Sequence, residues 1–490
     1  MKLGEAASLM GATNNLGAAL FDKRIKDFSI DSRSITEGEI FFALSQQDYV
    51  RAGFNGTFAD GHQFIAGALK KGAVAAVARI DHRRSEDLQP FEDRLLFVED
   101  VIAALQTLAR RVYESWNRPV VGITGSAGKT TAKELTAHIL NSSGRRVLKS
   151  ERNYNNGLGL PLSVLRMVSG GRSPSEFDVA VLEMGMSSPT HEIQRLCRIT
   201  PPDIGVELMV APVHLEYLGS IENIAAAKAE LIEGLKPGGT AVLNADDEWV
   251  IKMRQKHEGR TITFGIQNEA DVRADAINTE HLGLMTFTLM TPLGHSHAAL
   301  PMTGRHNLMN ALAAAAVATC FQIEPERIAD ALRTATPPQM RGEVLDFAAG
   351  FTIVDDSYNS NPQSLLNMVR TIAEGGQTRK RRIVIAGEML ELGPDEATLH
   401  HEAGRQIAQS GIDLLWGVRG LACEIVAGAR DSGLAATRFF ESSEDASQAV
   451  IAELRAGDLA LVKGSRGVAT DKIVKAIKEQ YPLVGEDERA

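Results

Sequence analysis

The chain has 490 residues, enough for about three domains. Its formal net charge of −10 argues against a nucleic-acid-binding protein, because such proteins present a basic face. A hydrophobic fraction of 44% with 44 glycines is typical of an α/β protein with tight turns between strands and helices. The longest apolar stretch, 311–321, is too short to cross a bilayer, so no membrane insertion is expected.

Cysteine use and the first residues indicate the compartment. The three cysteines at 197, 320 and 423 are odd in number, far apart and without metal-ligand spacing. We interpret them as buried thiols of a reducing compartment. Since the first residues carry no secretory signal pattern, we expect a cytoplasmic protein.

Residues 1–116 read as a small α/β domain. Apolar runs at 40–44 and 73–77 predict strands, and 63–71 predicts a helix between them. The segment 117–119 contains a proline and is a plausible domain boundary.

A glycine-rich loop after the next apolar run, 120–123, is the strongest motif of the chain. It reads Gly125-Ser126-Ala127-Gly128-Lys129-Thr130-Thr131 and precedes a helix-like stretch at 133–140. Backbone N–H groups and the helix dipole of such a loop attract phosphate oxygens. Lys129 can reach the β- and γ-phosphates, and the Thr130 hydroxyl can ligate Mg²⁺. Ile123 stands where the standard pattern has glycine, which disfavours ordinary GTPases and kinases.

The central domain is expected to cover 117–337. Apolar runs at 179–182, 204–210 and 240–243 predict strands of a parallel sheet. The segments 261–264 and 285–289 suggest a small antiparallel patch, followed by helices at 307–320 and 325–333.

Several polar residues of this domain have two readings. Glu183 ends a strand and is placed to bind Mg²⁺, or it is a solvated strand-end residue. His214 follows the next strand and is either functional or structural. Lys228, taken alone, is an exposed helical lysine. The segment 153–161 is a loop rich in asparagine, and Asn307 is a candidate helix N-cap.

The last domain, 338–490, is expected to be Rossmann-like, with strands at 351–354, 383–386 and 459–462. Asp356 and Tyr358 follow the first of these strands. Lys463, Ser465 and Arg466 follow the last. Both groups are candidates for a ligand-binding rim, or they are ordinary turns between strand and helix.

Together these segments resemble the Mur ligases, which form amide bonds in peptidoglycan precursors at the expense of ATP. The phosphate loop, the segment 153–161, Glu183, His214, Lys228 and residues 304–310 match blocks of the superfamily in order. The segments 355–362, 387–393 with His401 downstream, and 463–467 point to the member that adds the terminal dipeptide. Asp31-Ser32-Arg33 and Asp60-Gly61-His62 resemble the uridine-binding first domain.

The resemblance implies three domains: a UDP-binding domain over 1–116, an ATP-binding domain over 117–337, and a third over 338–490 that binds the incoming dipeptide and part of ATP. ATP would phosphorylate the C-terminal carboxylate of UDP-N-acetylmuramoyl-tripeptide, and D-alanyl-D-alanine would attack the acyl phosphate. The family also suggests a monomer.

The resemblance further implies roles for particular residues. The residues implied in catalysis are Lys129, His214, Lys228 and Arg341. Two Mg²⁺ sites are implied, and their ligands would be Thr130, Glu183, His214 and a carbamylated Lys228. The nucleotide would contact residues 125–131, Asn307, Arg341, Asp356 and Tyr358. The other substrates would contact Asp31, Ser32, Arg33, Asn155, Asn156, Lys463, Ser465 and Arg466.

Two other classes of function remain open. One is another ligase of the superfamily, which adds the third residue of the peptide or belongs to the folylpolyglutamate type. The third-residue ligase usually has Tyr-Ala-His where this chain has Ser357-Tyr358-Asn359, which disfavours it. The other is a P-loop nucleotide-binding protein without ligase activity.

Overall fold

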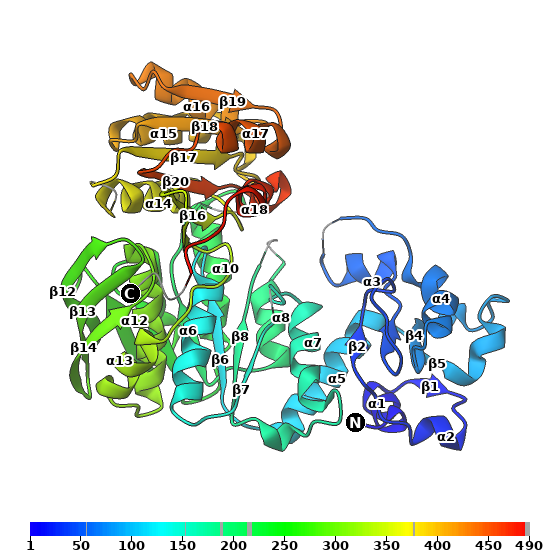
Figure 1. Ribbon diagram of the computed structural model, residues 1–490. Coiled ribbons are helices and arrows are strands. Elements are labelled where there is room, and N and C mark those ends of the chain that lie inside the picture. Colours follow the sequence, from blue (N-terminus) through cyan, green and yellow to red (C-terminus); the bar gives the residue numbers. More distant parts are fainter. Residues whose placement is uncertain (55, 152, 187–189, 213–217, 376–377, 486–490) are drawn as a thin grey trace.

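The computed structural model describes residues 1–54, 56–151, 153–186, 190–212, 218–375 and 378–485. Three sheets follow one another along the chain, each in its own region (Figure 1). The first region (blue) and the third (yellow to red) both lie against the central one (cyan to green) (Figure 1). This arrangement confirms the predicted three-part α/β fold. The domain limits at 116/117 and 337/338 stay predictions.

The first region is built on a small, mostly parallel sheet. Its strands, in the order β1-β5-β4-β3-β2, are β1 (Thr13–Asn14), β2 (Phe28–Ser29), β3 (Ile40–Phe42), β4 (Ala75–Arg79) and β5 (Leu95–Val98). Its helices are α1 (Leu3–Met10), α2 (Ala18–Phe21), α3 (Gln46–Arg51) and α4 (Ile65–Lys70). The predicted strands correspond to β3 and β4, and the predicted helix to α4 with a 3₁₀ turn before it.

Helix α5 (Val101–Trp116) joins the first region to the central one. The Asp100 carboxylate caps its N-terminus by accepting from the Ala103 N–H. Leu105 and Leu108 are fully buried in one apolar cluster with residues of both regions, such as Phe42 and Leu182. The two regions therefore share a hydrophobic core.

A larger mixed sheet forms the centre of the molecule, in the order β14-β13-β12-β11-β10-β9-β6-β8-β7. Its strands are β6 (Val120–Thr124), β7 (Val147–Lys149), β8 (Val179–Glu183), β9 (Ile204–Glu207), β10 (Thr240–Asn244), β11 (Arg260–Gly265), β12 (Val272–His281), β13 (Leu284–Thr291) and β14 (Gly294–Leu300). The antiparallel prediction for 261–264 is wrong. A crossover through α11 (Glu248–Lys252) returns the chain in the original direction, so β11 pairs parallel with β10. Antiparallel pairing begins between β12 and β13.

Helices cover both faces of this sheet. They are α6 (Lys129–Ser142), α7 (Gly159–Leu165), α8 (Glu192–Ile199), α10 (Ile221–Glu233), α12 (Arg305–Cys320) and α13 (Pro325–Arg333). The run of alanines in α12 is buried, and small side chains let this helix approach α6 and the sheet closely. The predicted helices at 307–320 and 325–333 are confirmed.

The third region has a doubly wound sheet, in the order β15-β16-β20-β17-β18-β19. The strands are β15 (Glu343–Asp346), β16 (Thr352–Asp356), β17 (Arg381–Gly387), β18 (Leu414–Val418), β19 (Thr437–Phe440) and β20 (Asp458–Lys463). The helices are α14 (Pro362–Gly375), α15 (Glu396–Gln409), α16 (Ala422–Asp431), α17 (Ser443–Glu453) and α18 (Asp471–Gln480). Apart from β15, the strands are parallel, with an apolar cluster on each face, which confirms the Rossmann-like prediction.

The thiol prediction holds only in part. Cys197 is buried, and burial raises the pKa of its thiol to about 12. Cys320 and Cys423 are half-buried, so they do not fit the expected burial. Among the described residues, no helix combines the length and apolarity needed to cross a membrane.

Because the first two regions share a core, we expect that truncating a side chain in it lowers the stability of the protein. Leu108→Ala removes a fully buried side chain from the cluster that joins the first two regions. We expect the free energy of unfolding to fall by about 2–5 kcal/mol, measured by urea titration. Arg111→Ala, on the exposed face of the same helix, should change it by less than about 1 kcal/mol. Equal effects of the two substitutions would contradict a core at this helix.

Candidate active site

A cleft of about 720 Å³ lies where the central sheet meets the third region. It is lined by the phosphate loop, by Glu183 at the end of β8, and by Arg341, Asp356 and Lys463. Carboxyl ends of parallel strands are the usual binding edge of α/β sheets, because helix N-termini and loops converge there. Most predicted site residues of the central and third regions are thus brought together.

Two glycines shape the phosphate loop between β6 and α6. Gly125 has φ +153°, and a Cβ there would lie 2.8 Å from the Leu208 Cβ. Gly128 has φ +85°, and a Cβ there would lie 2.3 Å from the Asn310 Oδ1. Both positions therefore require glycine. The Ser126 hydroxyl donates to the Ala211 carbonyl (3.1 Å) and accepts from its N–H (2.9 Å), which ties the loop to the segment after β9.

Lys129 is the first residue of α6. Its Nζ donates to the Gly125 carbonyl at 2.7 Å, so its side chain folds back over the loop. Burial lowers the pKa of Lys129, and the charge of Arg341 lowers it further. An anion in the loop would relieve this repulsion between two cations.

Glu183 is held at the end of β8 by neighbours on both oxygens. The Thr130 hydroxyl donates to its Oε2 at 3.0 Å, and the Asn155 amide donates to its Oε1 at 2.9 Å. The residue is 2% exposed, which rules out the solvated strand-end reading. A carboxylate beside a hydroxyl offers the hard oxygen ligands that Mg²⁺ prefers, so these residues fit a magnesium ion.

Lys133 is a buried lysine that no sequence motif indicated. Its Nζ donates to the Ser150 carbonyl at 2.8 Å and lies 4.0 Å from Glu183 Oε2. Ser150 in turn accepts from the Glu183 N–H through its hydroxyl at 3.0 Å. The available signal was a lysine on the buried face of the predicted helix.

Arg341 connects the third region to the phosphate loop. Its Nη2 donates to the Thr130 hydroxyl at 3.4 Å, and its guanidinium carbon lies 4.0 Å from the centre of the Tyr358 ring. Stacking on an aromatic face fixes the planar guanidinium while leaving donors free for a second partner.

Asp356 and Lys463 form a buried ion pair at the ends of β16 and β20. The Lys463 Nζ lies 2.6 Å from the Asp356 Oδ2 and also donates to the Asn359 carbonyl at 2.9 Å. These adjacent parallel strands bring the two predicted residues together at the cleft.

Asn307 lies inside α12 rather than at its N-cap, which is Gly304. The N-cap reading is therefore wrong. The Asn307 side chain is buried and donates to the Thr303 carbonyl at 2.8 Å. His306 beside it lines the cleft, and its buried Nδ1 has no hydrogen-bond partner among the described residues.

Lys228 on α10 is 2% exposed, so its reading as an exposed helical lysine is wrong. Burial lowers its pKa to about 7, and the charge of Lys129 acts in the same direction. Glu207, at the end of β9, is fully buried, and burial raises its pKa to about 8. His214, the predicted partner of Lys228 at a metal ion, lies outside the described residues.

Some predicted substrate residues do not line the cleft. Asp31 and Arg33 form a surface ion pair of 2.8 Å in a turn with Ser32, and this pair holds the pKa of Asp31 near 2. The Asn156 side chain lines the cleft but also caps the turn into α7 by accepting from the Gly159 N–H at 2.9 Å.

Of the predicted residues at and after the end of β20, some line the cleft and others do not. Ser465 is buried and accepts from the Leu390 N–H at 3.0 Å. Arg466 is exposed and lies 3.4 Å from the Asp471 carboxylate. Neither residue lines the cleft, whereas Lys463 does.

His400, which stands beside the motif residue His401, holds the segment 387–393 in place. The Met389 N–H donates to His400 Nε2 at 2.9 Å, while His401 is exposed and lies 3.1 Å from Asp431. Burial lowers the pKa of His400.

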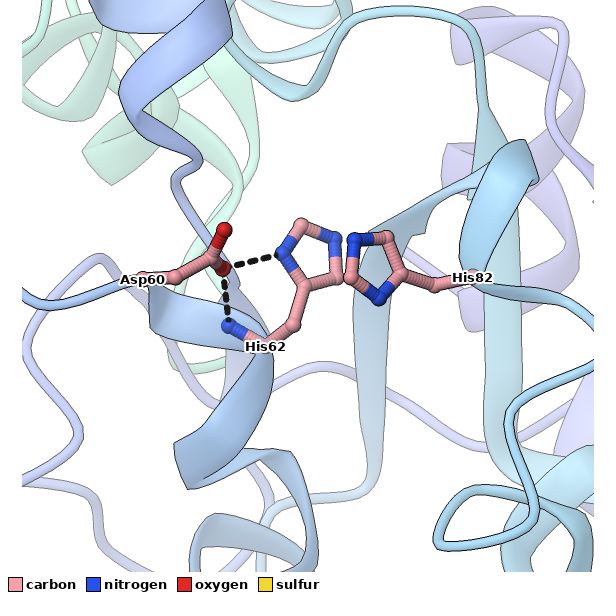
Figure 2. Close-up of side chains that lie close together, drawn as sticks. All are labelled: Asp60, His62 and His82. Carbon is pink, nitrogen blue, oxygen red and sulfur yellow. Dashed lines mark hydrogen bonds and ion pairs between the residues drawn. The ribbon is translucent and has the colours of Figure 1, made fainter.

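Asp60, His62 and His82 cluster in the first region (Figure 2). The His62 Nδ1 lies 2.6 Å from the Asp60 carboxylate, and its ring stacks on His82 with centroids 3.9 Å apart. The Arg79 N–H donates to His62 Nε2 at 2.9 Å. Both ring nitrogens of His62 are thus engaged, which leaves no lone pair for a metal ion. The Asp60-Gly61-His62 motif therefore ties its own turn to β4 through the hydrogen bond from the Arg79 N–H.

Two family models and a curated relative match most of the chain. Residues 123–318 match the Mur ligase middle domain, and 340–466 match the Mur ligase, glutamate ligase domain. UDP-N-acetylmuramoyl-tripeptide–D-alanyl-D-alanine ligase of Bacillus subtilis (strain 168) is 32% identical over 93% of each chain.

Solved structures agree with the sequence relatives. MurF from Acinetobacter baumannii has a TM-score of 0.82 at 26% identity, covering 98% of each chain. MurF ligase from Thermotoga maritima, in complex with ADP, has a TM-score of 0.78 at 26% identity and covers 94% of this chain and 98% of its own. Since the family models match more than half of the chain and a relative of 32% identity is covered over 93% of its length, this chain belongs to the Mur ligase family.

Proposed function

We propose that this chain is an ATP-dependent ligase that joins D-alanyl-D-alanine to the C-terminal carboxylate of UDP-N-acetylmuramoyl-tripeptide. The product is the UDP-pentapeptide precursor of peptidoglycan, with ADP and phosphate released. The observation that carries the proposal is the reach of Arg341 from the third region to Thr130 in the phosphate loop. The name and full-length similarity of the Bacillus subtilis relative support these substrates.

The reaction has two steps. The tripeptide carboxylate first takes the γ-phosphoryl group of ATP, which gives an acyl phosphate and ADP. The amine of D-alanyl-D-alanine then attacks the acyl carbon, phosphate leaves, and the amine loses a proton. Because the carboxylate and the phosphoryl group are both anionic, Lys129 and Arg341 serve to offset the charge that gathers between them.

The oxygen ligands beside the loop suit the metal that ATP chemistry needs. Thr130 and Glu183 would hold one Mg²⁺, and His214 with Lys228 would help to hold a second. Bound magnesium neutralises phosphate oxygens and orients them. Asn155 and Lys133 keep the Glu183 carboxylate in place by the contacts described above.

The remaining predicted residues divide between the three substrates. We assign Asn307, Asp356 and Tyr358 to binding of the nucleotide. The residues assigned to binding of the two peptide substrates are Asn155, Asn156, Lys463, Ser465 and Arg466. Asp31, Ser32 and Arg33 bind the uridine part in the first region. Since the cleft takes residues from two regions, closure would shield the acyl phosphate from water. We expect a monomer that acts in the cytoplasm.

Lys228 is the candidate for carbamylation. Burial lowers its pKa to about 7, so a substantial fraction of its side chain is a neutral amine at neutral pH. A neutral amine adds to carbon dioxide and releases one proton, which gives a carbamate with one negative charge. This change would convert a cation into an oxygen ligand suited to magnesium.

The first experiment measures phosphate release from ATP with UDP-N-acetylmuramoyl-tripeptide, with and without D-alanyl-D-alanine. We expect release that needs both substrates and a UDP-pentapeptide seen by mass spectrometry. Release with the UDP-dipeptide and a single amino acid would indicate the third-residue ligase. Release that no acceptor stimulates would indicate a P-loop ATPase without ligase activity.

Arg341 should matter for chemistry more than for folding. We expect Arg341→Met to lower kcat by about 10²–10³-fold, because it removes a cation from the site of charge development. The thermal midpoint should stay close to that of the wild type. Arg333→Met, on an exposed helix position, is the matched control and should leave kcat unchanged. Wild-type kcat in Arg341→Met would contradict the role of the arginine.

Carbamylation of Lys228 predicts a dependence on carbon dioxide and pH. At constant dissolved carbon dioxide, the neutral amine fraction rises as pH rises through about 7, so labelling should rise with it. We expect isotopically labelled bicarbonate to give one carbamate signal by NMR that is absent in Lys228→Met. A signal that persists in this variant would place the carbamate elsewhere.

A further inference from the structure

The short segment 52–54 of the first region contacts the central region beside the cleft. It follows α3 and touches two parts of the central region: the loop 153–157 after β7, and Thr190 with Arg195 after β8. Because β7 and β8 are parallel neighbours, the chain leaves both strands at the carboxyl edge of the sheet, where the phosphate loop also lies. No step of the proposed reaction uses this segment.

Gly53 lets the segment approach α8 closely. Its φ is +76°, and a Cβ there would lie 2.9 Å from both the Arg195 Nη1 and the Thr190 Oγ1. The Arg195 guanidinium donates to the Ala52 carbonyl at 2.5 Å and to the Thr190 hydroxyl at 2.8 Å. A side chain at position 53 would displace the arginine, so glycine is required here. The backbone before Phe54 is therefore held against the central region.

The ring of Phe54 lies against Gly157, the last residue of the loop 153–157. A Cβ at Gly157 would lie 3.0 Å from the Phe54 Cζ and 3.0 Å from the Gln106 Nε2. Gln106, on α5, also donates to the Gly157 carbonyl at 2.9 Å. The ring of Tyr49 supports Phe54 from behind, with ring centres 4.9 Å apart. Side chains from outside the loop thus enclose Gly157.

The loop that ends at Gly157 carries two residues that line the cleft, Asn155 and Asn156. The Asn155 carbonyl accepts from the Gly185 N–H at 2.7 Å, and a Cβ at Gly185 would lie 2.8 Å from the Asn155 side chain. The Asn156 side chain accepts from the Gly159 N–H at 2.9 Å. These contacts leave little room on either side of Gly157, so a shift of this glycine would move both asparagines.

We propose that Phe54 is a positioning residue, which holds the loop 153–157 so that Asn155 and Asn156 face the peptide part of the nucleotide-linked substrate. This inference rests on the proposed function, because the two asparagines are assigned there to peptide binding. A displacement of about 1 Å in a residue that orients a substrate weakens its contacts substantially. A residue from the first region therefore sets the shape of a binding loop in the central region.

Binding of ATP should depend much less on Phe54. The phosphate loop is in close contact with Leu208 and Asn310, and its Ser126 is hydrogen-bonded to Ala211. None of these three partners belongs to the loop 153–157. Loss of the Phe54 ring should therefore separate the two substrates, with a weaker peptide substrate and an unchanged nucleotide.

The test compares Michaelis constants of the full chain in the complete ligase reaction. We expect Phe54→Ala to raise KM for UDP-N-acetylmuramoyl-tripeptide about tenfold, while KM for ATP changes less than about threefold. Titration calorimetry with the UDP-tripeptide alone should show the same loss of affinity. A purely structural role would lower the thermal midpoint and leave both Michaelis constants at their wild-type values.

Variants of the contact itself test whether the ring acts through Gly157. Phe54→Leu keeps an apolar group against the glycine and should keep KM for the UDP-tripeptide within about threefold of the wild type. Gly157→Ala places a methyl group against the ring and should raise this KM. Combining Gly157→Ala with Phe54→Leu makes room for the methyl group, so KM should recover.

Val50→Ala is the matched control, because Val50 lies on α3 close to Phe54 in sequence but is 63% exposed. It should leave both Michaelis constants and the thermal midpoint unchanged. A wild-type KM for the UDP-tripeptide in Phe54→Ala, or in Gly157→Ala if the first variant does not fold, would overturn the inference while the proposed function stands. A wild-type protein inactive with both substrates would overturn the proposed function itself.

Discussion

The bond between Arg341 and Thr130 makes the site depend on the relative position of two separately cored regions. The phosphate loop belongs to the central sheet, whereas the stacking partner of Arg341, Tyr358, belongs to the third region. Neither region alone brings together the cations that an anionic reaction requires. A change in the angle between them would remove the arginine and leave the loop intact, which makes domain position a natural control of the chemistry.

The first region is tied to the central one by different means. Helix α5 buries apolar side chains against both regions, which gives them a shared core. The N-terminus of α5 is also held by Asp48, whose carboxylate accepts from the Val101 N–H at 2.9 Å and forms an ion pair with Arg79. The contact of the third region with the phosphate loop through Arg341 is polar, whereas the contact of the first region with the central one is an apolar core.

Sequence patterns predicted the elements well wherever one physical signal dominated. The phosphate loop follows from glycines that no other residue can replace, and the apolar runs at 120–123 and 179–182 became central strands. The direction of β11 could not be predicted from its own residues, because pairing depends on the crossover before it. The same limit explains Asn307, whose capping chemistry is local but whose position inside α12 depends on Gly304.

Buried charged residues were the hardest to assign from sequence, and they are the residues that distinguish this site. Lys133, Glu207 and Lys228 each stand in stretches that read as ordinary helix or strand, and only tertiary packing shows that they are inside. Burying them opposes folding, since each loses hydration that its partners replace only in part. Their concentration around one loop therefore indicates that the fold sacrifices stability there to hold fixed charges where phosphate charge develops.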